Sequence, residues 1–512
     1  MKSFISVLLL APVLLGQGAP SFQERVQGIM NRPEYRHSRF GMEFYSLETG
    51  QAVFKLNADQ LFVPGSTTKL VTIGTALGVL GPDYRFHTRV YGGGSLHSNG
   101  TLKGDLVMVA GGDPDLSNRV RSDGTLAFEN VDHSYSPTPG AKAVPGDPLA
   151  VIQELAKQVA AKGVKRIEGV VRIDATLFPE GDRELGTGIV ISPIVVNDNV
   201  VDVTITPGAK EGDAASITVS PQSGYVQVVN RAKTAAPRTP ATVGFGADQK
   251  VAGGSHSVVL EGNVPSGGPA VLRVYKVPEP SAFAATVLKE ALQHEGIRVD
   301  GKALTPEPYS DQALLAEHVS PPLIEEARVT LKVSQNLHAS MMPFIVGALG
   351  GKAKDNIDQK GFDLEHALLE KAGLDLSAIS QSDGAGGAAY FTPDFMAHFL
   401  AYMSGLPYFE GYYRALPILG KDGTLWDIQV NSPAAGHVHA KTGTYASYNA
   451  VDKNLMIDGK GLAGYLTTQD GHKLAFAIYA NLVPADQETG AHTVGDALGE
   501  IAGAAYDSRF EP

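Results

Sequence analysis

The sequence predicts a mixed α/β (α+β) fold in which one unit, with helices packed on a sheet, is interrupted by a large β-rich insertion. Runs with strand alternation and with helical spacing occur near both ends of the chain. The middle block instead has short Val/Ile/Thr alternations separated by Gly, Pro, Asn and Asp. A chain of 512 residues, 43% hydrophobic and 19% charged, has enough apolar material for a large core, which excludes wholesale disorder.

The N-terminal unit is expected to begin with a hairpin. Residues 40–54 alternate on both sides of Leu47–Gly50, as two strands joined by a turn do. A helix should start near Pro64 and end at Gly81, because apolar residues recur at helical spacing between them. Residues 147–162 form the one helix expected in the middle block.

The C-terminal unit combines helices with a final group of strands. Helical spacing occurs in residues 282–295, 323–349, 362–372, 394–404 and 493–506, and strand-like runs occupy 437–445, 461–468 and 473–482. We therefore predict that residues 19–90 and 277–512 form one catalytic-type domain. Residues 91–276 would form the inserted β-rich module, which could comprise two subdomains.

Composition excludes several functional classes. Lys+Arg 42 against Asp+Glu 54 gives a net charge of -12, which argues against a nucleic-acid partner or an anionic membrane surface. The chain has no cysteine, so disulfides, thiolate metal sites and cysteine nucleophiles are excluded. A covalent catalyst would have to be a serine, a threonine, a lysine or a carboxylate.

The first 18 residues are typical of a secretory signal peptide. Lys2 precedes an apolar stretch over residues 4–15, and small residues precede a possible cleavage site after Gly18. The alternative is a buried N-terminal helix, which Pro12 disfavours. No later window holds about 20 continuous apolar residues, so no transmembrane anchor is predicted. We expect an exported, periplasmic or extracytoplasmic protein.

Ser66-Thr67-Thr68-Lys69 is the first of three short motifs that carry chemistry. Ser66 and Lys69 are three residues apart on the predicted helix, so the amine can reach the hydroxyl. A lysine that loses its proton near neutral pH can activate a serine, and a helix N-terminus favours the developing negative charge. Gly65 would leave room for a substrate backbone. The alternative is a serine that caps a surface helix, with Lys69 in solvent.

Two further motifs follow in order. Ser334-Gln335-Asn336 lies at a join between helical segments, where a hydroxyl could relay a proton and a carboxamide could hold a substrate amide. Lys441-Thr442-Gly443-Thr444 lies on a strand-like run, where a lysine and hydroxyls could bind a carboxylate and Gly443 would admit a ligand backbone. Taken singly, each also fits an ordinary polar surface, and Ser447-Tyr448-Asn449 is a decoy of the second motif.

The ordered trio resembles that of the penicilloyl-serine transferases, which comprise penicillin-binding proteins and serine β-lactamases. Ser66 and Ser334 are too far apart in the sequence for a compact β-lactamase, and the β-rich insertion fills the gap. The chain is similar to the D-alanyl-D-alanine carboxypeptidase/endopeptidase family of low-molecular-mass, class C penicillin-binding proteins. That resemblance implies a penicillin-binding-protein/β-lactamase-like transpeptidase domain with a large insertion. Further similar stretches are residues 104–106, 111–114, 196–199, 320–323, 416–425 and 462–465.

The resemblance also implies a role for each motif residue. Ser66 would attack the carbonyl of the D-Ala-D-Ala peptide bond, with Lys69 as its base. Ser334 would pass a proton to the leaving nitrogen, and Asn336 would hold the peptide amide. The groups implied to recognise the terminal carboxylate are Lys441, Thr442 and Thr444. The backbone N–H groups of Ser66 and Thr444 would form the oxyanion hole.

The family further implies partners and an activity. The implied activity is that of a serine-type D-Ala-D-Ala carboxypeptidase, with D,D-endopeptidase activity as an option. The implied substrates are peptidoglycan peptides, and the implied inhibitors are β-lactams. No metal or cofactor is implied. A β-lactamase or esterase of the same fold and a catalytically idle wall-binding scaffold are the alternatives. Labelled penicillin separates the three, because they differ in whether an adduct forms and persists.

Two segments depart from the family pattern. Asp383–Ala388 lacks the two hydroxyls that usually follow this aspartate, and the segment from Tyr445 to Lys460 is longer than usual. Other candidates are interpreted as structural. His437 and His439 lack a third metal ligand nearby, and Asp113 precedes a proline, which predicts a turn.

Overall fold

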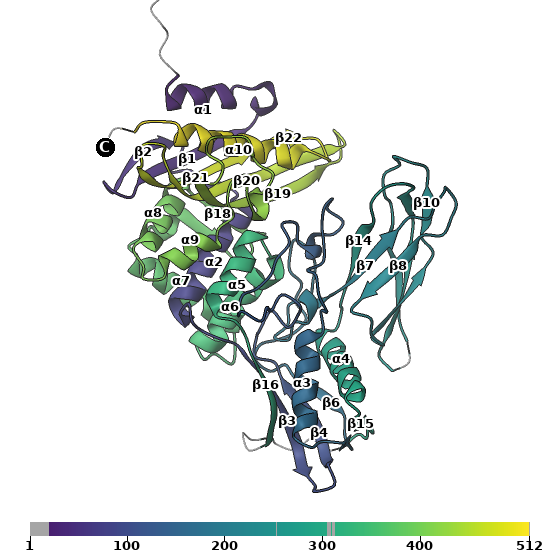
Figure 1. Cartoon of the computed structure of the whole chain (residues 1–512). Coiled ribbons are helices and arrows are strands. Elements are labelled where there is room, and N and C mark those ends of the chain that lie inside the picture. The colour runs from purple at the N-terminus through teal and green to yellow at the C-terminus, as the bar shows by residue number, and fades with distance from the viewer. Residues whose placement is uncertain (1–19, 252, 305–308, 310–312, 511–512) are drawn as a thin grey trace, which may run out of the picture.

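The computed structural model describes residues 20–251, 253–304, 309 and 313–510. The predicted signal peptide lies outside the described residues. Helices and strands are distributed over a large unit that contains both ends of the described chain and a set of smaller sheets (Figure 1). No helix in the described ranges is long and apolar enough to cross a membrane.

The central sheet joins strands from the two ends of the chain. Its order is β19-β20-β21-β1-β2, all antiparallel, and the short strand β22 also pairs with β20. The strands are β1 (Arg39–Ser46), β2 (Gln51–Leu56), β19 (Val438–Asn449), β20 (Asn454–Thr467), β21 (Lys473–Asn481) and β22 (Val483–Ala485). The predicted hairpin and the three predicted C-terminal strands are thereby confirmed. Strands β19 and β20 extend beyond the predicted runs, because the longer segment between them continues the hairpin.

Both faces of this sheet are buried at its middle strand β21, which has apolar or aromatic side chains from Leu474 to Ala480. Alternate residues such as Phe476 and Ile478 pack with helices α1 (Phe22–Met30) and α10 (Gly490–Tyr506) on one face. The residues between them, such as Ala477 and Tyr479, pack against the helical layer on the other face. Figure 1 shows this layering, with α1 and α10 above the sheet and the other helices below it.

The helical layer places the first two motifs. Its members are α2 (Lys69–Leu80), α5 (Leu323–Lys332), α6 (Asn336–Ile345), α7 (Ile357–Lys371), α8 (Pro393–Ser404) and α9 (Phe409–Ala415). A small hairpin of β17 (Ile379–Gln381) and β18 (Ala389–Phe391) follows α7. The helical stretch predicted for residues 323–349 is divided at Ser334, whose φ of 62° lies in the left-handed region. Gln335 then caps α6 by accepting a hydrogen bond from the N–H of Leu337.

The remaining strands form smaller sheets. One has the order β15-β5-β4-β3-β16, with β6 also paired to β4, and the others are β14-β7-β8, β11-β12-β9 and β10-β13. Their bounds are β3 (His87–Leu96), β4 (Thr101–Val109), β5 (Arg166–Ile167), β6 (Val171–Asp174), β7 (Val200–Thr206), β8 (Ser216–Ser220), β9 (Val226–Asn230), β10 (Lys233–Ala235), β11 (Gly244–Lys250), β12 (His256–Glu261), β13 (Asn263–Pro265), β14 (Val271–Lys276), β15 (Arg298–Val299) and β16 (Leu314–Val319). Helices α3 (Ala150–Ala161) and α4 (Pro280–His294) pack together beside the first of these sheets.

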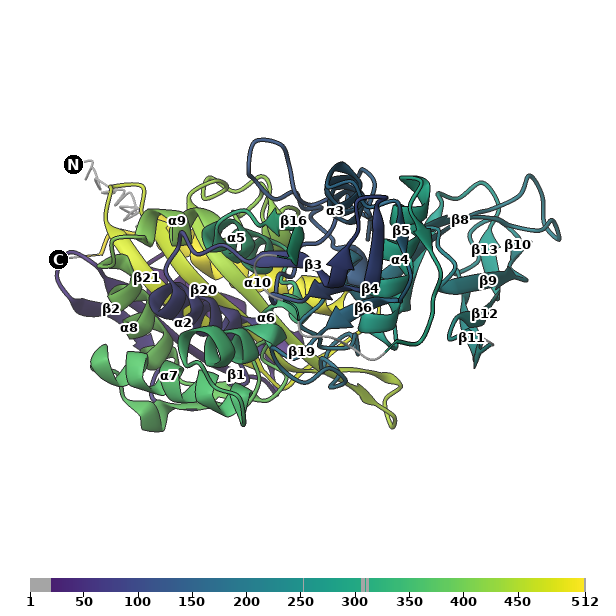
Figure 2. The ribbon, with the colours of Figure 1, turned by 90° about the horizontal axis from the view of Figure 1, so that it is seen from below.

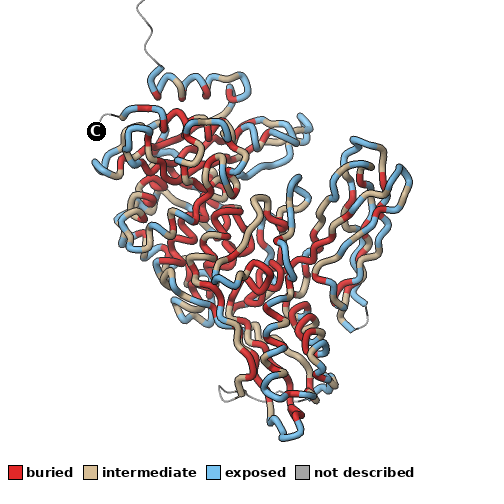
Figure 3. The backbone as a smooth tube through the Cα atoms, viewed as in Figure 1, coloured by how far each residue is buried: buried red, intermediate tan, exposed pale blue. Residues whose placement is uncertain are grey.

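The strands β7 to β14 lie at the end of the molecule remote from α8 in both ribbon views (Figures 1 and 2). Their backbone is largely exposed or half-buried, whereas buried residues concentrate in the central sheet and its helices (Figure 3). Strand β16 pairs with β3, so that sheet continues past residue 276. The division of the chain into domains stays a prediction, and we propose that the insertion returns to the main unit near residue 320.

Candidate active site

Residues from all three motifs line a single cleft of about 820 Å³. Ser66 comes from the turn that precedes α2, Ser334 and Asn336 from the join between α5 and α6, and Thr442 and Thr444 from strand β19. The opposite wall comes from the insertion, including residues 129–132 and 138–140. The cleft therefore lies where the sheet, the helical layer and the insertion meet.

The serine of the first motif lies on a 3-10 turn that leads into α2. Gly65–Thr68 form this turn, and the α-helix begins at Lys69. The predicted helix therefore starts near Pro64, as expected, but the turn that carries Ser66 has 3-10 geometry. In a 3-10 turn the side chains at i and i+3 are eclipsed, which brings the two reacting groups closer than an α-helix does. The Lys69 Nζ donates a hydrogen bond to Ser66 Oγ at 2.7 Å.

The turn and strand β19 are held together by glycines. A β-carbon on Gly65 would lie 2.6 Å from the backbone nitrogen of Thr444, and one on Gly443 would lie 2.0 Å from the carbonyl oxygen of Pro64. The space that sequence analysis assigned to a substrate backbone at both glycines is therefore filled by the protein itself. The same contact brings the backbone nitrogens of Ser66 and Thr444 to neighbouring positions beside the nucleophile.

Lys69 is completely buried and binds three acceptors. Besides Ser66 Oγ, its Nζ donates to Asn336 Oδ1 at 2.7 Å and to the carbonyl oxygen of Ala385 at 3.1 Å. Burial lowers the pKa of Lys69 to about 7, although the carboxylates of Glu184 and Asp383 oppose this shift. An amine with this pKa can exist in its neutral form at physiological pH and can accept a proton from the serine.

The loop Asp383–Ala388, which departs from the family pattern, lies behind Lys69. The Asp383 carboxylate accepts hydrogen bonds from the backbone N–H groups of Ala385, Gly386, Gly387 and Ala388, so the loop is wrapped around it. A β-carbon on Gly386 would lie 2.1 Å from the carbonyl oxygen of Gly65. The missing hydroxyls are replaced by small residues that let this loop pack directly against the turn carrying Ser66.

The second motif is held by Tyr135 of the insertion. The single hydrogen of the Tyr135 hydroxyl is shared between two acceptors, the carbonyl oxygen of Ser334 and Asn336 Oδ1, which lies 2.9 Å away. Gln335 points the other way and donates to Asp132 Oδ1 at 3.3 Å and to Ser134 Oγ at 3.2 Å. Each residue of the motif thus contacts the insertion, and the strained backbone of Ser334 is fixed from both sides.

A buried network of charges supports this contact. Arg119 pairs with Asp132 and, at 2.6 Å, with Asp198, and His338 of α6 bridges Asp198 at 2.9 Å and Glu326 of α5 at 3.1 Å. Burial alone would lower the pKa of His338, but the two carboxylates raise it well above its ordinary value. The imidazolium is therefore the expected form. Charged groups thus connect the insertion to both helices that flank Ser334.

Asp113 and Asp115 belong to the same buried region. The predicted turn is confirmed, because Asp113 Oδ1 accepts the N–H of Asp115 at 3.0 Å. Their burial was not predicted, and it raises the pKa of Asp113 to about 7.

The third motif lies on edge strand β19, as predicted. Thr442 and Thr444 line the cleft, but Lys441 is completely buried, and its Nζ donates to the carbonyl oxygen of Thr442 at 2.7 Å. Lys460 on the neighbouring strand β20 donates from its Nζ to Thr444 Oγ1 at 2.8 Å and also lines the cleft. Sequence analysis missed Lys460, because only the register of β19 and β20 places it opposite Thr444.

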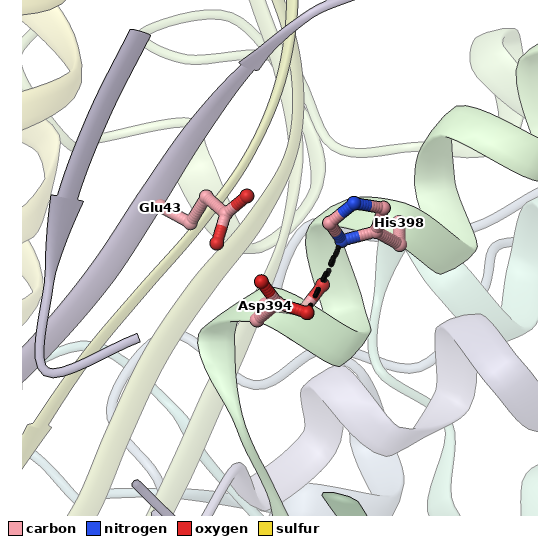
Figure 4. A group of neighbouring side chains, drawn as sticks. All are labelled: Glu43, Asp394 and His398. Carbon is pink, nitrogen blue, oxygen red and sulfur yellow. Dashed lines mark hydrogen bonds and ion pairs between the residues drawn. The ribbon is translucent and has the colours of Figure 1, made fainter. Parts of the chain in front are cut away.

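Other groups with metal-ligand chemistry are already neutralised by neighbours. Glu43, Asp394 and His398 lie together between β1 and α8 (Figure 4), but the Lys55 Nζ lies 2.7 Å from Asp394 Oδ1 and 3.3 Å from Glu43 Oε2. A second group consists of Asp132, His133 and Asp198, and Arg119 binds both of its carboxylates. A third group consists of Asp115, Glu326 and His338. In this group both ring nitrogens of His338 already contact carboxylates.

The two histidines singled out from the sequence lie apart in aromatic stacks. His439 stacks on Tyr413 at 4.0 Å between ring centroids, and His437 stacks on Tyr506 at 4.9 Å.

Comparison with known proteins identifies relatives over most of the chain. The chain is 27% identical over 492 residues to a D-alanyl-D-alanine carboxypeptidase of Actinomadura sp. (strain R39), covering 91% of this chain and 82% of that relative. It is 25% identical over 469 residues to the D-alanyl-D-alanine carboxypeptidase DacB of Haemophilus influenzae, covering 87% of this chain and 85% of the relative.

The fold is that of a solved structure. The crystal structure of penicillin binding protein 4 from Haemophilus influenzae superimposes with a TM-score of 0.73 at 21% sequence identity, covering 94% of this chain and 99% of that chain. The predicted penicillin-binding-protein-like α+β fold is confirmed. The model of the D-Ala-D-Ala carboxypeptidase 3 (S13) family matches residues 22–499. The chain therefore belongs to the D-Ala-D-Ala carboxypeptidase 3 (S13) family.

Proposed function

We propose that this protein cleaves the terminal D-Ala-D-Ala bond of peptidoglycan stem peptides through an acyl-enzyme on Ser66. The observation that carries the proposal is the completely buried Lys69 amine, whose Nζ lies 2.7 Å from both Ser66 Oγ and Asn336 Oδ1. A hydroxyl, an amine with a lowered pKa and a substrate-binding carboxamide at these distances are what acyl transfer by serine requires.

In the first step, neutral Lys69 accepts the Ser66 proton while Oγ attacks the carbonyl carbon of the penultimate D-alanine. The resulting oxyanion is stabilised by the backbone N–H groups of Ser66 and Thr444, each worth about 3 kcal/mol in comparable sites. The C–N bond then breaks, and the departing D-alanine nitrogen receives a proton through the Ser334 hydroxyl. Water finally attacks the ester carbonyl and returns the Ser66 hydroxyl.

The remaining motif residues hold the peptide. Asn336 would bind the peptide amide through its carboxamide nitrogen, since its oxygen already accepts from Lys69 and Tyr135. Thr442 and Thr444 would donate to the terminal carboxylate from the cleft wall, with Gly443 setting the path of the strand between them. Lys441 is buried behind them, where burial and the nearby charges of Lys69 and Lys460 hold its pKa well below the ordinary value. It would support the strand through its hydrogen bond to the carbonyl oxygen of Thr442.

The wider role follows from the substrate. Peptidoglycan lies outside the cytoplasm, so we propose that the protein is exported by its N-terminal segment and acts in the periplasm or its equivalent. β-Lactams, which carry a reactive amide and a carboxylate, would acylate the same serine. Cleavage of peptide cross-links by D,D-endopeptidase activity stays a prediction.

The test is covalent labelling with a fluorescent penicillin, together with release of D-alanine from a synthetic peptide ending in D-Ala-D-Ala. The wild-type chain should form an adduct that lasts for minutes or longer, and Ser66→Ala should form none. Ser447→Ala, at the exposed serine of the decoy motif, is the matched control and should label normally. Labelling of Ser66→Ala would refute Ser66 as the nucleophile. Rapid hydrolysis of the wild-type adduct would identify a β-lactamase, and a wild-type chain that is not labelled would be a catalytically idle scaffold.

A further inference from the structure

Lys460 is the lysine whose ammonium faces the cleft beside the third motif. Among the residues that the structure describes, Lys142 and Lys460 are the lysines that line the cleft, and Lys142 belongs to the insertion. Lys441 of the motif itself is buried and is bound to the carbonyl oxygen of Thr442. The family motif therefore does not supply the positive charge that is nearest to the hydroxyl of Thr444.

The hydrogen bond between Lys460 and Thr444 has a defined direction. A protonated amine can only donate, so Thr444 Oγ1 is the acceptor at 2.8 Å. The hydrogen of the Thr444 hydroxyl is then left to point elsewhere, and Thr444 lines the cleft. The pair thus presents two donors, an N–H of the ammonium and the O–H of the threonine, to any acceptor bound there.

The charge of Lys460 is not cancelled by a neighbouring carboxylate. Lys460 makes no ion pair with any residue in the described part of the chain, and the nearby Asp427 is itself 3.5 Å from His492 Nε2. Burial lowers the pKa of Lys460 to about 8, and the charge of Asp427 opposes this shift. The amine is therefore mainly protonated at neutral pH. Charge-assisted hydrogen bonds from such a group to a carboxylate are among the strong ones.

We propose that Lys460 and Thr444 form a carboxylate-binding pair that makes the enzyme specific for an anionic C-terminus on the peptide and for the free carboxylate of β-lactams. This inference rests on the proposed function, because it places the substrate's terminal carboxylate beside β19. It assigns the recognition to a residue outside the three motifs, on strand β20 opposite Thr444.

The competing explanation is that Lys460 only supports Thr444 and strand β19. Both explanations predict that loss of the lysine slows acylation, so overall activity does not separate them. They differ in how the effect depends on the ligand. A binding role is lost only for a ligand that carries the carboxylate, whereas a structural role is lost equally for a ligand without it.

The experiment measures acylation rate constants for benzylpenicillin and for its methyl ester, which lacks the negative charge. In Lys460→Met we expect the preference for the acid over the ester to fall about tenfold, as for loss of one charge-assisted hydrogen bond. The rate for the ester should stay within about threefold of wild type, which also shows that the site is intact. Lys460→Arg should keep most of the preference. Lys453→Met, at an exposed lysine on the same hairpin, is the matched control and should behave as wild type.

The outcomes distinguish the two proposals. Equal slowing of acid and ester in Lys460→Met, or an unchanged preference, overturns the assignment of Lys460 while the acyl-enzyme on Ser66 stands. A wild-type chain that neither compound acylates overturns the proposed function, and this inference with it.

Discussion

The two sides of the cleft hold their reacting groups by different physical means. On the side of the central sheet, the turn with Ser66 and strand β19 touch through backbone atoms at Gly65 and Gly443. On the side of the insertion, Ser334 and Asn336 are held by the hydroxyl of Tyr135 and, through Gln335 and His338, by buried charges. The backbone contact on the sheet side has no room for an added atom. The contact on the insertion side is stable only while each buried charge is paired with its partner.

This difference predicts how each side fails. A β-carbon added to Gly443 would lie 2.0 Å from a backbone oxygen, which is not a flexible side-chain atom that can move aside, so even a small side chain must displace a strand. A buried ion network fails when one partner is removed, because the remaining charge stays buried without compensation. Mutations on the sheet side should therefore mainly reduce catalysis, and mutations in the network should mainly reduce stability.

The largest effect on catalysis is expected for Gly443→Ala. The new β-carbon would meet the carbonyl oxygen of Pro64, so β19 must shift and the N–H of Thr444 would leave the oxyanion position. Removal of one such donor costs a factor of about 100 to 1000, and we expect the acylation rate constant to fall by at least about 100-fold. Gly244→Ala, at a strand glycine with open space around it, should acylate normally. Acylation of Gly443→Ala within threefold of wild type contradicts the tight contact.

The second-largest effect is a loss of stability, which we expect for Arg119→Met. Removing the guanidinium leaves the carboxylates of Asp132 and Asp198 buried without their cation. The free energy of unfolding should fall by about 3–5 kcal/mol, measured by chemical denaturation. Arg121→Met removes a partly exposed arginine whose guanidinium hydrogen bonds the carbonyl oxygen of Pro145, and should cost less than about 0.5 kcal/mol. Equal stability of the two variants would mean that the network does not hold the insertion in place.

The smallest effect concerns the electrostatic influence of the insertion on Lys69. Acylation should rise with pH through about 7, because only the neutral amine accepts the serine proton. Glu184 of the insertion stabilises the ammonium, so Glu184→Gln should lower the pKa of Lys69. The rising limb of the acylation profile should then move to lower pH by about half a unit. Glu154→Gln, at an exposed residue of α3, should leave the profile unchanged, and a shift to higher pH would contradict the sign.

The sequence was sufficient to predict the fold class, the family and its serine-type D-Ala-D-Ala carboxypeptidase activity, which the family match confirms. These features could be predicted because each depends on a pattern of residues that are close together in the sequence. Hydrophobic periodicity located α2, and strand alternation located β19 to β21. The order of the three motifs then fixed which serine and which lysines to consider.

Long-range contacts were beyond the reach of the sequence. Tyr135 and Glu184 are far in sequence from the motif residues that they influence, and nothing local marks them. Lys460 follows Thr444 by only 16 residues, but its position opposite Thr444 depends on the register of the hairpin. The role of Asp383 had a usable signal, an aspartate followed by small residues that can wrap around its carboxylate. The path of β19 was misjudged at Gly443, because the space beside a glycine can be filled by the protein as well as by a ligand.

The pairing of β1 with β21 has a consequence for how the chain is made. Arg39 lies opposite Asn481, so the central sheet cannot close until nearly the whole polypeptide has left the ribosome. Until then β1 and β2 present unpaired edges, and the turn with Ser66 has no strand beside it. We expect the nascent protein to stay unfolded for longer than chains built from local units, a delay that would keep it extended for the export proposed above.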